Sequence, residues 1–332
     1  MKLSVVVPAY NESASVLEAR EAIVSVLQEQ LPYMDYEIIF VDDGSSDDTF
    51  EYLSSLCAAY SNVRAIKFVA NCGSHMAIRA GLEHATGDIA CFIACDLQDP
   101  PELIPQMNEL LAPPVQIVWA VRSSRKDSMI SRLFSRFFYI LARMMVSKNI
   151  PPSGASMFLL GNAALKAVQY YKERNLTLEG LFATMGFKHG YITYERRARQ
   201  QGHSKWTLSK RLKLFADFFV GYSYVPIRFM SYLGIIAATL GFIYALLVVG
   251  NKLFFYTPIE GYASLMAVVL LIGGIQMVMT GIIGEYIWRT LDEARSRPRY
   301  LIDTILEGNQ HPESSADREM VSSLTGEASF GE

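Results

Sequence analysis

Short apolar runs alternate with longer amphipathic stretches over the first 125 residues of the chain. The apolar runs, rich in valine and isoleucine, cover residues 3–9, 36–41, 63–69, 88–94 and 116–121. Stretches compatible with helices cover residues 13–30, 46–60, 74–86 and 101–111. Strands that are apolar on both faces and separated by helices are typical of a parallel sheet with helices on both sides. The pattern therefore predicts an α/β fold with a doubly wound, mainly parallel sheet, within a domain of residues 1–206.

Two long apolar segments follow in the last third of the chain. Residues 229–250 and 263–283 contain no charged side chain, and a helix of either length reaches ~30 Å, enough to cross a bilayer core. We predict transmembrane helices over 229–250 and 263–288, joined by an external loop of residues 251–262. The alternative is a buried helical hairpin in a soluble protein, but little chain would remain to cover two such helices.

Basic residues flank the two apolar segments on their outer sides. Lys205, Lys210, Arg211, Lys213 and Arg228 precede the first segment, and Arg289, Arg295, Arg297 and Arg299 follow the second. The loop between them offers only Lys252. By the positive-inside rule, both the large domain and the tail of residues 289–332 are predicted to be cytoplasmic, with the chain anchored in the cell inner membrane. The tail is rich in Ser, Glu and Gly, which predicts disorder from about residue 307.

An amphipathic stripe precedes the first apolar segment. Leu208, Leu212, Phe215, Phe219 and Tyr222 recur at steps of three and four residues, with charged residues off the stripe. We predict a helix over 207–228 that lies in the membrane interface. A helix that faces a protein core would show the same periodicity, so that alternative stays open.

The composition excludes several other classes of protein. Of 332 residues, 51% are hydrophobic, and 30 basic residues stand against 33 acidic ones, which predicts a sizeable core and no nucleic-acid partner. The four cysteines, Cys57, Cys72, Cys91 and Cys95, form no C-x-x-C pair, which favours buried free thiols over a metal site. The absence of a P-loop or a G-x-G-x-x-G sequence argues against P-loop NTPases and nicotinamide enzymes.

Polar residues gather where the predicted strands end. The first strand runs into 8–12, the second into 42–46, the fourth into 96–101 and the fifth into Arg122. Because ligands of parallel α/β sheets bind beyond the carboxyl ends of the strands, we expect these four ends to form one crevice. Each segment alone has a simpler explanation, since Ser45 or Ser46 could cap a helix and Asp99 to Glu102 could start one.

These motifs, in this order, make the chain resemble inverting family 2 glycosyltransferases. The resemblance covers about residues 1–306 and is strongest to the polyprenyl-phosphate sugar transferases, such as dolichyl-phosphate mannose synthases and prophage bactoprenol glucosyltransferases. The segments that carry it are VVVPAYNE, VDDGSSDDT, NCGSHMAIRAGLEHATGD, DLQDPPELIP, Arg199 with the Gly202–Trp206 segment GHSKW, and the C-terminal hairpin GYASLMAVVLLIGGIQMVMTGIIGEYIWR.

The resemblance implies a role for each of several residues. Pro8, Tyr10, Glu12, Asp42 and Asp43 would hold the base and ribose of a nucleotide sugar, first of all UDP-glucose. Asp96 and Gln98 would face Mg²⁺ or Mn²⁺ on the diphosphate, with Asp96 also counted as catalytic. Arg122, Arg199 and Lys205, and less strongly Arg132, would clamp phosphates of the donor or of undecaprenyl phosphate. Relatives of this kind also suggest a homo-oligomer.

Two departures from the family pattern weaken these implications. The metal motif usually reads Asp-x-Asp-Leu-Gln, whereas this chain has Ala94 at the first position, and Gly154-Ala155-Ser156-Met157 stands where bacterial relatives carry Gly-Asp-Phe-Arg. Mg²⁺ is often held by one or two carboxylates together with phosphate oxygens, so Asp96 and Gln98 could suffice. The rival hypothesis is an inactive membrane homologue that binds nucleotide sugar or lipid phosphate as a regulatory or assembly partner.

Overall fold

The computed structural model describes residues 1–123, 129–151, 154–171, 177–195, 225–255 and 261–309. The chain divides into two compact units. The sheet unit comprises Met1–Trp206 and Pro298–Glu332, and the hairpin unit comprises Thr207–Arg297. The predicted interfacial helix of residues 207–228 lies, up to residue 224, outside the described residues.

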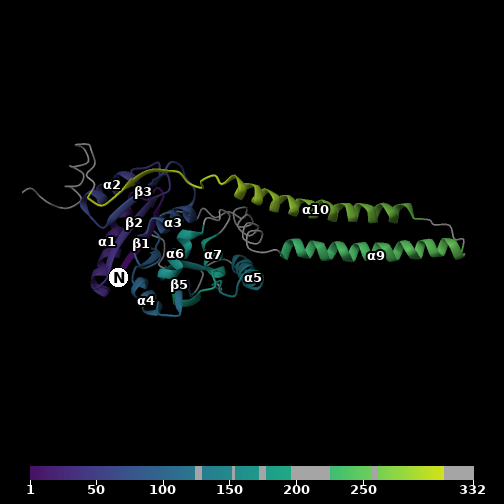
Figure 1. Cartoon of the computed structure of the whole chain (residues 1–332), viewed down its shortest axis with the longest axis horizontal. Helices are drawn as coiled ribbons and strands as arrows, with labels where there is room; N and C mark the ends of the chain where they lie inside the picture. Colours follow the sequence, from purple (N-terminus) through teal and green to yellow (C-terminus); the bar gives the residue numbers. More distant parts are fainter. Residues whose placement is uncertain (124–128, 152–153, 172–176, 196–224, 256–260, 310–332) are drawn as a thin grey trace, which may run out of the picture. The chain divides into compact units, whose positions relative to one another are not determined.

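The sheet unit is built on one eight-stranded sheet of order β7-β5-β6-β4-β1-β2-β3-β8 (Figure 1). Its strands are β1 (Lys2–Ala9), β2 (Asp35–Asp42), β3 (Val63–Phe68), β4 (Ile89–Phe92), β5 (Val115–Arg122), β6 (Ala155–Leu160), β7 (Lys188–Tyr194) and β8 (Ile302–Leu306). The pairs β1–β2, β1–β4, β2–β3 and β5–β7 are parallel, whereas β6 and β8 run antiparallel to their neighbours. The predicted mainly parallel, doubly wound sheet is confirmed, and β6, β7 and β8 were not predicted.

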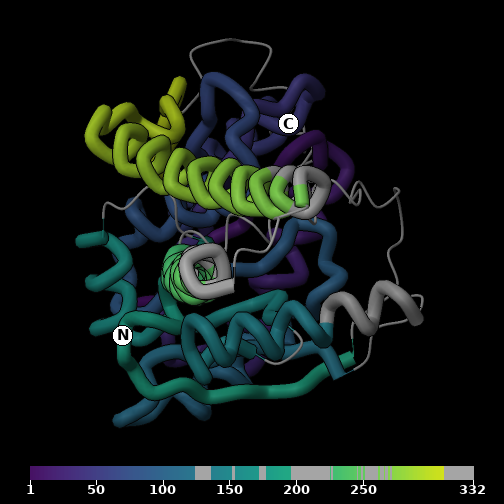
Figure 2. Tube along the Cα trace, turned by 90° about the vertical axis from the view of Figure 1, so that its right-hand side faces the viewer, coloured from purple at the N-terminus to yellow at the C-terminus, as the bar shows by residue number. Residues whose placement is uncertain are grey.

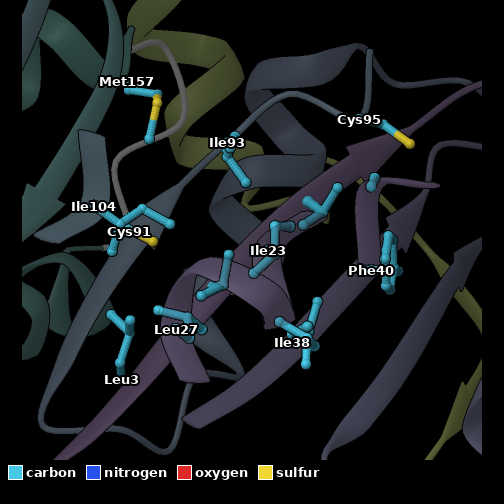
Figure 3. Close-up of a cluster of buried hydrophobic side chains, with 14 of the residues drawn as sticks. Leu3, Ile23, Leu27, Ile38, Phe40, Cys91, Ile93, Cys95, Ile104 and Met157 are labelled. Atoms are coloured by element: carbon cyan, nitrogen blue, oxygen red, sulfur yellow. The ribbon is translucent and has the colours of Figure 1, made fainter. Parts of the chain in front are cut away.

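Helices cover both faces of the sheet because its central strands are apolar on both sides. Helices α1 (Val16–Gln30), α2 (Thr49–Ala59) and α4 (Leu103–Leu110) share one core cluster with strand residues such as Val5 and Phe40. Helices α3 (Ser74–Glu83), α6 (Asn162–Tyr170) and α7 (Leu178–Thr184) share the other with strand residues such as Val6 and Ile39. Figure 3 shows the first cluster, with Ile23 and Leu27 of α1 over the strands. One further helix, α5 (Met129–Met145), joins β5 to β6.

Three of the four cysteines belong to this buried interior. Cys57, Cys91 and Cys95 are buried free thiols, as predicted, but Cys72 is partly exposed. Burial raises the pKa of Cys57 to about 12, so this thiol stays protonated at neutral pH.

The hairpin unit holds two long apolar helices, α9 (Val225–Phe255) and α10 (Tyr262–Arg295) (Figures 1 and 2). The predicted spans 229–250 and 263–288 lie within them. Each contains a window that is long and apolar enough to cross a membrane, Ile227–Tyr244 and Leu271–Arg295, and both windows are unburied. Such exposed apolar helices suit a bilayer as their solvent.

After α10 the chain forms the last strand of the sheet. β8 pairs antiparallel with β3, and the Tyr300 ring stacks on Phe68 with centroids 4.6 Å apart. The Tyr300 hydroxyl donates to Glu83, and Glu307 pairs with Arg64 at 2.6 Å. The strand lies within the segment predicted as the tail, which is described as far as residue 309. Its pairing covers the β3 edge of the sheet, which would otherwise carry unpaired backbone groups.

Tyr300→Ala should therefore destabilise the sheet unit by ~2 kcal/mol, because the stacked ring and its hydrogen bond are both lost. This corresponds to a fall of roughly 4–8 °C in the thermal unfolding midpoint of the full-length protein in detergent. Tyr300→Phe should cost about half as much, since it keeps the ring. Tyr33→Ala, at an exposed position, is the control; an equal effect of Tyr33→Ala and Tyr300→Ala would show that the contacts of Tyr300 add no stability.

Candidate functional site

The parallel strands deliver the predicted polar residues to one edge of the sheet. Strands β4, β1 and β2 are neighbours, so the segments that follow them are adjacent. β5 also ends at this edge, but the antiparallel strand β6 separates it from β4. Arg122 is therefore two strands away from the end of β4.

Hydrogen bonds connect the segments that follow β1 and β2. The Asn11 amide donates to Ser45 Oγ at 2.9 Å, and the Ser46 amide donates to Asn11 Oδ1 at 2.9 Å. The Glu12 amide donates to Thr49 Oγ1 at 2.9 Å. Ser45 and Ser46 therefore bind the β1 segment and do not cap α2, whose N-cap residue is Asp48.

Pro8 and Tyr10 differ in how far they are available to a ligand. Pro8 lies within β1, opposite Val41 of β2, and is partly buried. Tyr10 follows the strand with 40% of its surface exposed. An exposed aromatic ring at this edge can stack on a nucleobase, because base faces are apolar and polarisable.

Asp43 binds the loop that follows β3. Its carboxylate accepts hydrogen bonds from the Cys72 amide at 2.7 Å, the Gly73 amide at 2.9 Å and Asn71 Nδ2 at 3.0 Å. Burial raises the pKa of Asp43 above its usual value, against the bonds from Cys72 and Gly73, and the neighbouring Asp42 adds to the rise. In the structure, then, both oxygens of Asp43 position the 71–73 loop, a role that the sequence did not indicate.

Gly44 allows this loop to approach. Its φ is +68°, and a Cβ there would lie 2.7 Å from the Ala70 carbonyl carbon. Only glycine can adopt this positive φ and also leave room for the Ala70 backbone without strain. The tight turn after Asp43 is thus fixed by contact with the segment that follows β3.

Asp42 is buried with one carboxylate oxygen satisfied. Oδ1 accepts from the Ser45 amide at 3.0 Å, while Oδ2 has no hydrogen-bond partner within the described ranges. A buried acceptor without a partner is costly, so this oxygen is suited to a donor group that arrives with a ligand.

The segment after β4 places one partly exposed acid at the same edge. Asp96 Oδ1 accepts from the Gln98 amide at 3.2 Å, Leu97 has a φ of +50°, and Gln98 is buried. Burial raises the pKa of the neighbouring Cys95 thiol, and the nearby carboxylates of Glu12 and Asp96 raise it further. Cys95 is thus an unreactive thiol near the acids that follow β1 and β4.

Asp96 and Gln98 suit a divalent cation only in part. Among the residues that the structure describes, no group of three His, Cys, Asp or Glu side chains lies close enough to hold a metal ion. Ala94 supplies no oxygen where the family motif carries a carboxylate. The donor set fits a Mg²⁺ or Mn²⁺ ion that shares its coordination with phosphate oxygens, and it does not fit a site made by protein ligands alone.

A polar network connects Arg122 with the segment after β4. Arg122 Nε donates to Ser156 Oγ of β6 at 2.5 Å. In the sheet register Arg122 also lies opposite Tyr194 of β7, and the Tyr194 hydroxyl donates to the buried Asp99 carboxylate. Burial and the bond to Asp99 raise the pKa of Tyr194 to about 12, so its phenol keeps the proton that it donates.

This network was not foreseen from the sequence, although one signal was available. Ser156 belongs to the segment that departs from the motif implied by the resemblance, and its hydroxyl lies beside the Arg122 guanidinium. Tyr194 had no motif to mark it. Asp99, which sequence alone offered as part of a helix start, is a buried acceptor, and α4 begins later, at Leu103.

Other predicted site residues cannot be placed. Arg199 and Lys205 lie outside the described residues. Arg132 lies on α5, in the part of the helix whose side chains are not described.

The opposite edge of the sheet carries a pocket of about 470 Å³, lined by Lys2, Tyr36, Glu37, Ser61, Asn62, Arg64, Thr86, Glu307 and Gly308. Its cations are already paired: Lys2 Nζ lies 3.1 Å and Arg64 Nη1 lies 3.5 Å from the buried Glu37. Burial raises the pKa of Glu37, but hydrogen bonds from Ser4, Thr86 and Lys2 outweigh it and hold the pKa below its usual value. The cluster is an internal ion-pair network at the edge remote from the predicted site.

Two known families match this chain. Residues 4–167 match Glycosyl transferase family 2, and residues 225–289 match the GtrB C-terminal hairpin. Among solved structures, the mannosyltransferase PcManGT from Pyrobaculum calidifontis in complex with GDP-Man and Mn²⁺ aligns with a TM-score of 0.48 at 15% identity, over 89% of this chain and 88% of that chain. A likeness this weak carries no argument about ligands here.

Relatives match over nearly their whole lengths. Glycosyltransferase YkcC of Bacillus subtilis (strain 168) is 36% identical over 91% of this chain and 93% of the relative. The SfII prophage-derived bactoprenol glucosyl transferase of Shigella flexneri is 33% identical over 93% of this chain and 100% of the relative. The undecaprenyl-phosphate 4-deoxy-4-formamido-L-arabinose transferase of Sodalis glossinidius (strain morsitans) is 34% identical over 95% of this chain and 96% of the relative. With this coverage, the sheet described above and the two apolar helices behind it, the chain belongs to glycosyl transferase family 2 and carries the GtrB C-terminal hairpin.

Proposed function

We propose that the protein transfers a hexose from a nucleoside diphosphate sugar to a polyprenyl phosphate, with inversion at the anomeric carbon. UDP-glucose is the first choice of donor and undecaprenyl phosphate the first choice of acceptor. The observation that carries the proposal is the sheet edge where Asp96 follows β4, Arg122 donates to Ser156, and Tyr194 binds the buried Asp99. Relatives named as transferases to bactoprenol and undecaprenyl phosphate support the choice of acceptor.

The reaction is a single displacement at the anomeric carbon. An oxygen of the lipid phosphate forms a bond to that carbon while the bond to the diphosphate oxygen breaks, and the nucleoside diphosphate leaves with the bonding electron pair. The attacking oxygen is already anionic at neutral pH, so no strong general base is required. The protein would contribute by positioning the two substrates and by neutralising the charge that develops on the diphosphate.

The segments after β1, β2 and β3 form the proposed donor site. Tyr10, exposed at this edge, would stack on the base. Pro8 would lie beside it, and Glu12 and the unpaired Oδ2 of Asp42 would accept hydrogen bonds from base or ribose. Asp43 would act through the 71–73 loop that it holds.

Asp96 and Gln98 would hold the divalent cation. A bound Mg²⁺ or Mn²⁺ ion would neutralise charge on the diphosphate as the bond to the sugar breaks. Because Ala94 contributes no ligand, phosphate oxygens and water would complete the coordination shell. Binding of the cation would therefore depend strongly on the donor.

Cations would complete the site on the acceptor side. Arg122 is held by Ser156 with its guanidinium group at the sheet edge, and Arg199 and Lys205, with a lesser part for Arg132, are proposed to clamp phosphates beside it. Basic residues precede α9 and follow α10 in the sequence, where the chain joins the sheet unit, so this unit would lie on the cytoplasmic face of the inner membrane. A homo-oligomer in that membrane remains our prediction.

Loss of the first metal carboxylate favours a second candidate, a non-catalytic homologue that binds nucleotide sugar or lipid phosphate. The two differ in turnover. Membranes supplied with radiolabelled UDP-glucose, undecaprenyl phosphate and Mg²⁺ or Mn²⁺ should yield organic-soluble label if the protein is an enzyme. Binding of the nucleotide sugar without label, across the common nucleotide sugars, would favour the non-catalytic homologue.

Asp96→Asn should lower this transfer by a factor on the order of 10² or more, because charge stabilisation on the leaving group is lost. Asp35→Asn is the matched control, since Asp35 is an exposed acid at the start of β2, on the opposite edge. Its initial rate should equal that of the unchanged protein. Equal rates for Asp96→Asn and Asp35→Asn would remove Asp96 from the site.

Ala94→Asp should lower the Mg²⁺ or Mn²⁺ concentration needed for half-maximal transfer, because it restores a second carboxylate. The measurement is a metal titration of the initial rate at fixed donor. A titration that does not change would place the cation away from the end of β4.

Ser156→Ala should reduce transfer roughly tenfold, the equivalent of ~1.4 kcal/mol, because the guanidinium of Arg122 is no longer held. A double-mutant cycle with Arg122→Ala distinguishes positioning from general stability. If Ser156 acts through Arg122, adding Ser156→Ala to Arg122→Ala should cost nothing further. Losses that multiply would mean that Ser156 acts independently of Arg122.

A further inference from the structure

The short segment 299–301, which precedes β8, runs beside the loop that follows β3. Because β8 is antiparallel to β3, its start lies level with the end of β3, as the pairing of Phe68 with Ile302 shows. One further backbone bond extends the ladder past both strands, since the Val69 amide donates to the Leu301 carbonyl at 3.0 Å. Figure 1 shows this part of the chain, in yellow, along β3. The segment therefore lies at the ligand edge of the sheet.

Tyr300 attaches this segment to both β3 and α3. Its ring stacks on Phe68 with centroids 4.6 Å apart and an interplanar angle of 12°, and its hydroxyl donates to Glu83. Glu83 also accepts from Arg79 Nε at 2.8 Å, and Arg79 is buried. Burial and the bond to Glu83 raise the pKa of Tyr300, so its phenol keeps the proton that it donates. A charge-assisted hydrogen bond thus joins α3 to the segment.

Arg299 adds a contact at the first turn of α3. Its Nη1 donates to Met76 Sδ at 3.8 Å, a weak hydrogen bond to a thioether. The contacts of the segment therefore fall on the end of β3 and on the start of α3, that is, on both sides of the loop between them. Asp43 of the segment after β2 binds the middle of the same loop, at residues 71–73. The loop is held from two directions by parts of the chain that lie far apart in sequence.

We propose that Tyr300 is a positioning residue for the nucleotide-sugar donor: together with the Leu301 carbonyl it fixes the two ends of the loop that Asp43 binds. A loop with free ends samples more conformations, and ordering it on binding would cost affinity. The effect should fall on donor binding and not on bond cleavage, because β3 is three strands away from β4, which Asp96 follows. That the loop belongs to a donor site rests on the proposed function; the hold of Tyr300 on the loop does not.

The first measurement is hydrogen–deuterium exchange of a peptide that covers residues 69–76, in the full-length protein in detergent. This peptide contains the Cys72 and Gly73 amides that donate to Asp43. The matched control is Leu306→Ala, on the same strand but opposite Ala65, where Leu306 packs on the first core cluster. Both changes weaken β8, but only Tyr300→Ala removes the contacts beside the loop.

We expect exchange in this peptide to be at least about fivefold faster in Tyr300→Ala than in Leu306→Ala. Tyr300→Phe, which keeps the ring and loses only the bond to Glu83, should accelerate exchange about twofold over the unchanged protein. This milder variant carries the test if Tyr300→Ala does not fold. Exchange that is equal in the Tyr300 and Leu306 variants would overturn the proposal.

The second measurement is the initial rate of transfer from UDP-glucose at varied donor concentration. Tyr300→Ala should raise the KM for UDP-glucose about tenfold and change kcat by less than about twofold, because uniform binding is lost and the reacting atoms are untouched. Leu306→Ala should leave the KM unchanged, since a loss of stability alone does not alter donor affinity. A lower kcat at unchanged KM in Tyr300→Ala would overturn the positioning role.

The exchange measurement needs no nucleotide sugar and no turnover. Faster loop exchange in Tyr300→Ala, in a protein that transfers no sugar, would support the hold of Tyr300 on the loop and refute only the proposed function. Transfer by the unchanged protein, with equal exchange in the Tyr300 and Leu306 variants, would do the reverse.

Discussion

Parallel hydrogen bonding among β4, β1 and β2 is the constraint on which the rest of this molecule depends. In a parallel ladder every carboxyl end lies at the same edge, so Asp96, Tyr10 and Asp43 are neighbours although up to 86 positions separate them in the chain. Strands buried on both faces allow little freedom of register, because a slip would carry apolar side chains out of two cores at once. The segments at the edge are fixed in turn: Asn11 binds Ser45 and Ser46, and Asp43 holds the 71–73 loop.

The reversed strand β6 changes what this edge can do. It separates Arg122 from the end of β4, but it also brings Ser156 beside the guanidinium group. The hydrogen bond from Tyr194 of β7 to the buried Asp99 likewise reaches the segment after β4. A buried carboxylate is costly unless it is hydrogen-bonded, so this bond offsets much of the penalty while it joins β7 to the segment after β4. The site is thus an arrangement of several strand ends rather than a single motif.

The two edges of the sheet use charge differently. At the amino edge, Glu37 gathers Lys2, Arg64, Ser4 and Thr86 into a closed network, and Glu307 adds the end of β8 to it. At the carboxyl edge, Asp96 is partly exposed and Asp42 Oδ2 has no partner in the described part of the chain. Polar groups whose hydrogen bonds are all made within the protein stabilise a rigid fold, whereas polar groups with unused hydrogen-bonding capacity can bind a ligand. The pocket at the amino edge is thus lined by cations that are already paired with Glu37.

The sequence by itself determined the α/β class, the first five strands, the two apolar helices and the strand ends that carry the polar residues. Each of these is a local property, readable from periodicity, hydropathy and turn residues over a few consecutive positions. The departures from the family motifs at Ala94 and at Ala155–Met157 were also visible in the sequence, but only as the absence of the expected side chains.

The tertiary structure alone decided that Ser156 holds Arg122, that Tyr194 binds Asp99, that Asp43 positions a loop beyond β3 and that β8 completes the sheet. Such contacts join residues that lie far apart in the sequence. Asp43 and Cys72 are 29 positions apart, and Cys57 and Leu306, whose contact joins β8 to α2, are 249 positions apart. Their existence depends on strand order and direction, which hydropathy does not encode, because an apolar run fits equally well at any place in a sheet that is buried on both faces.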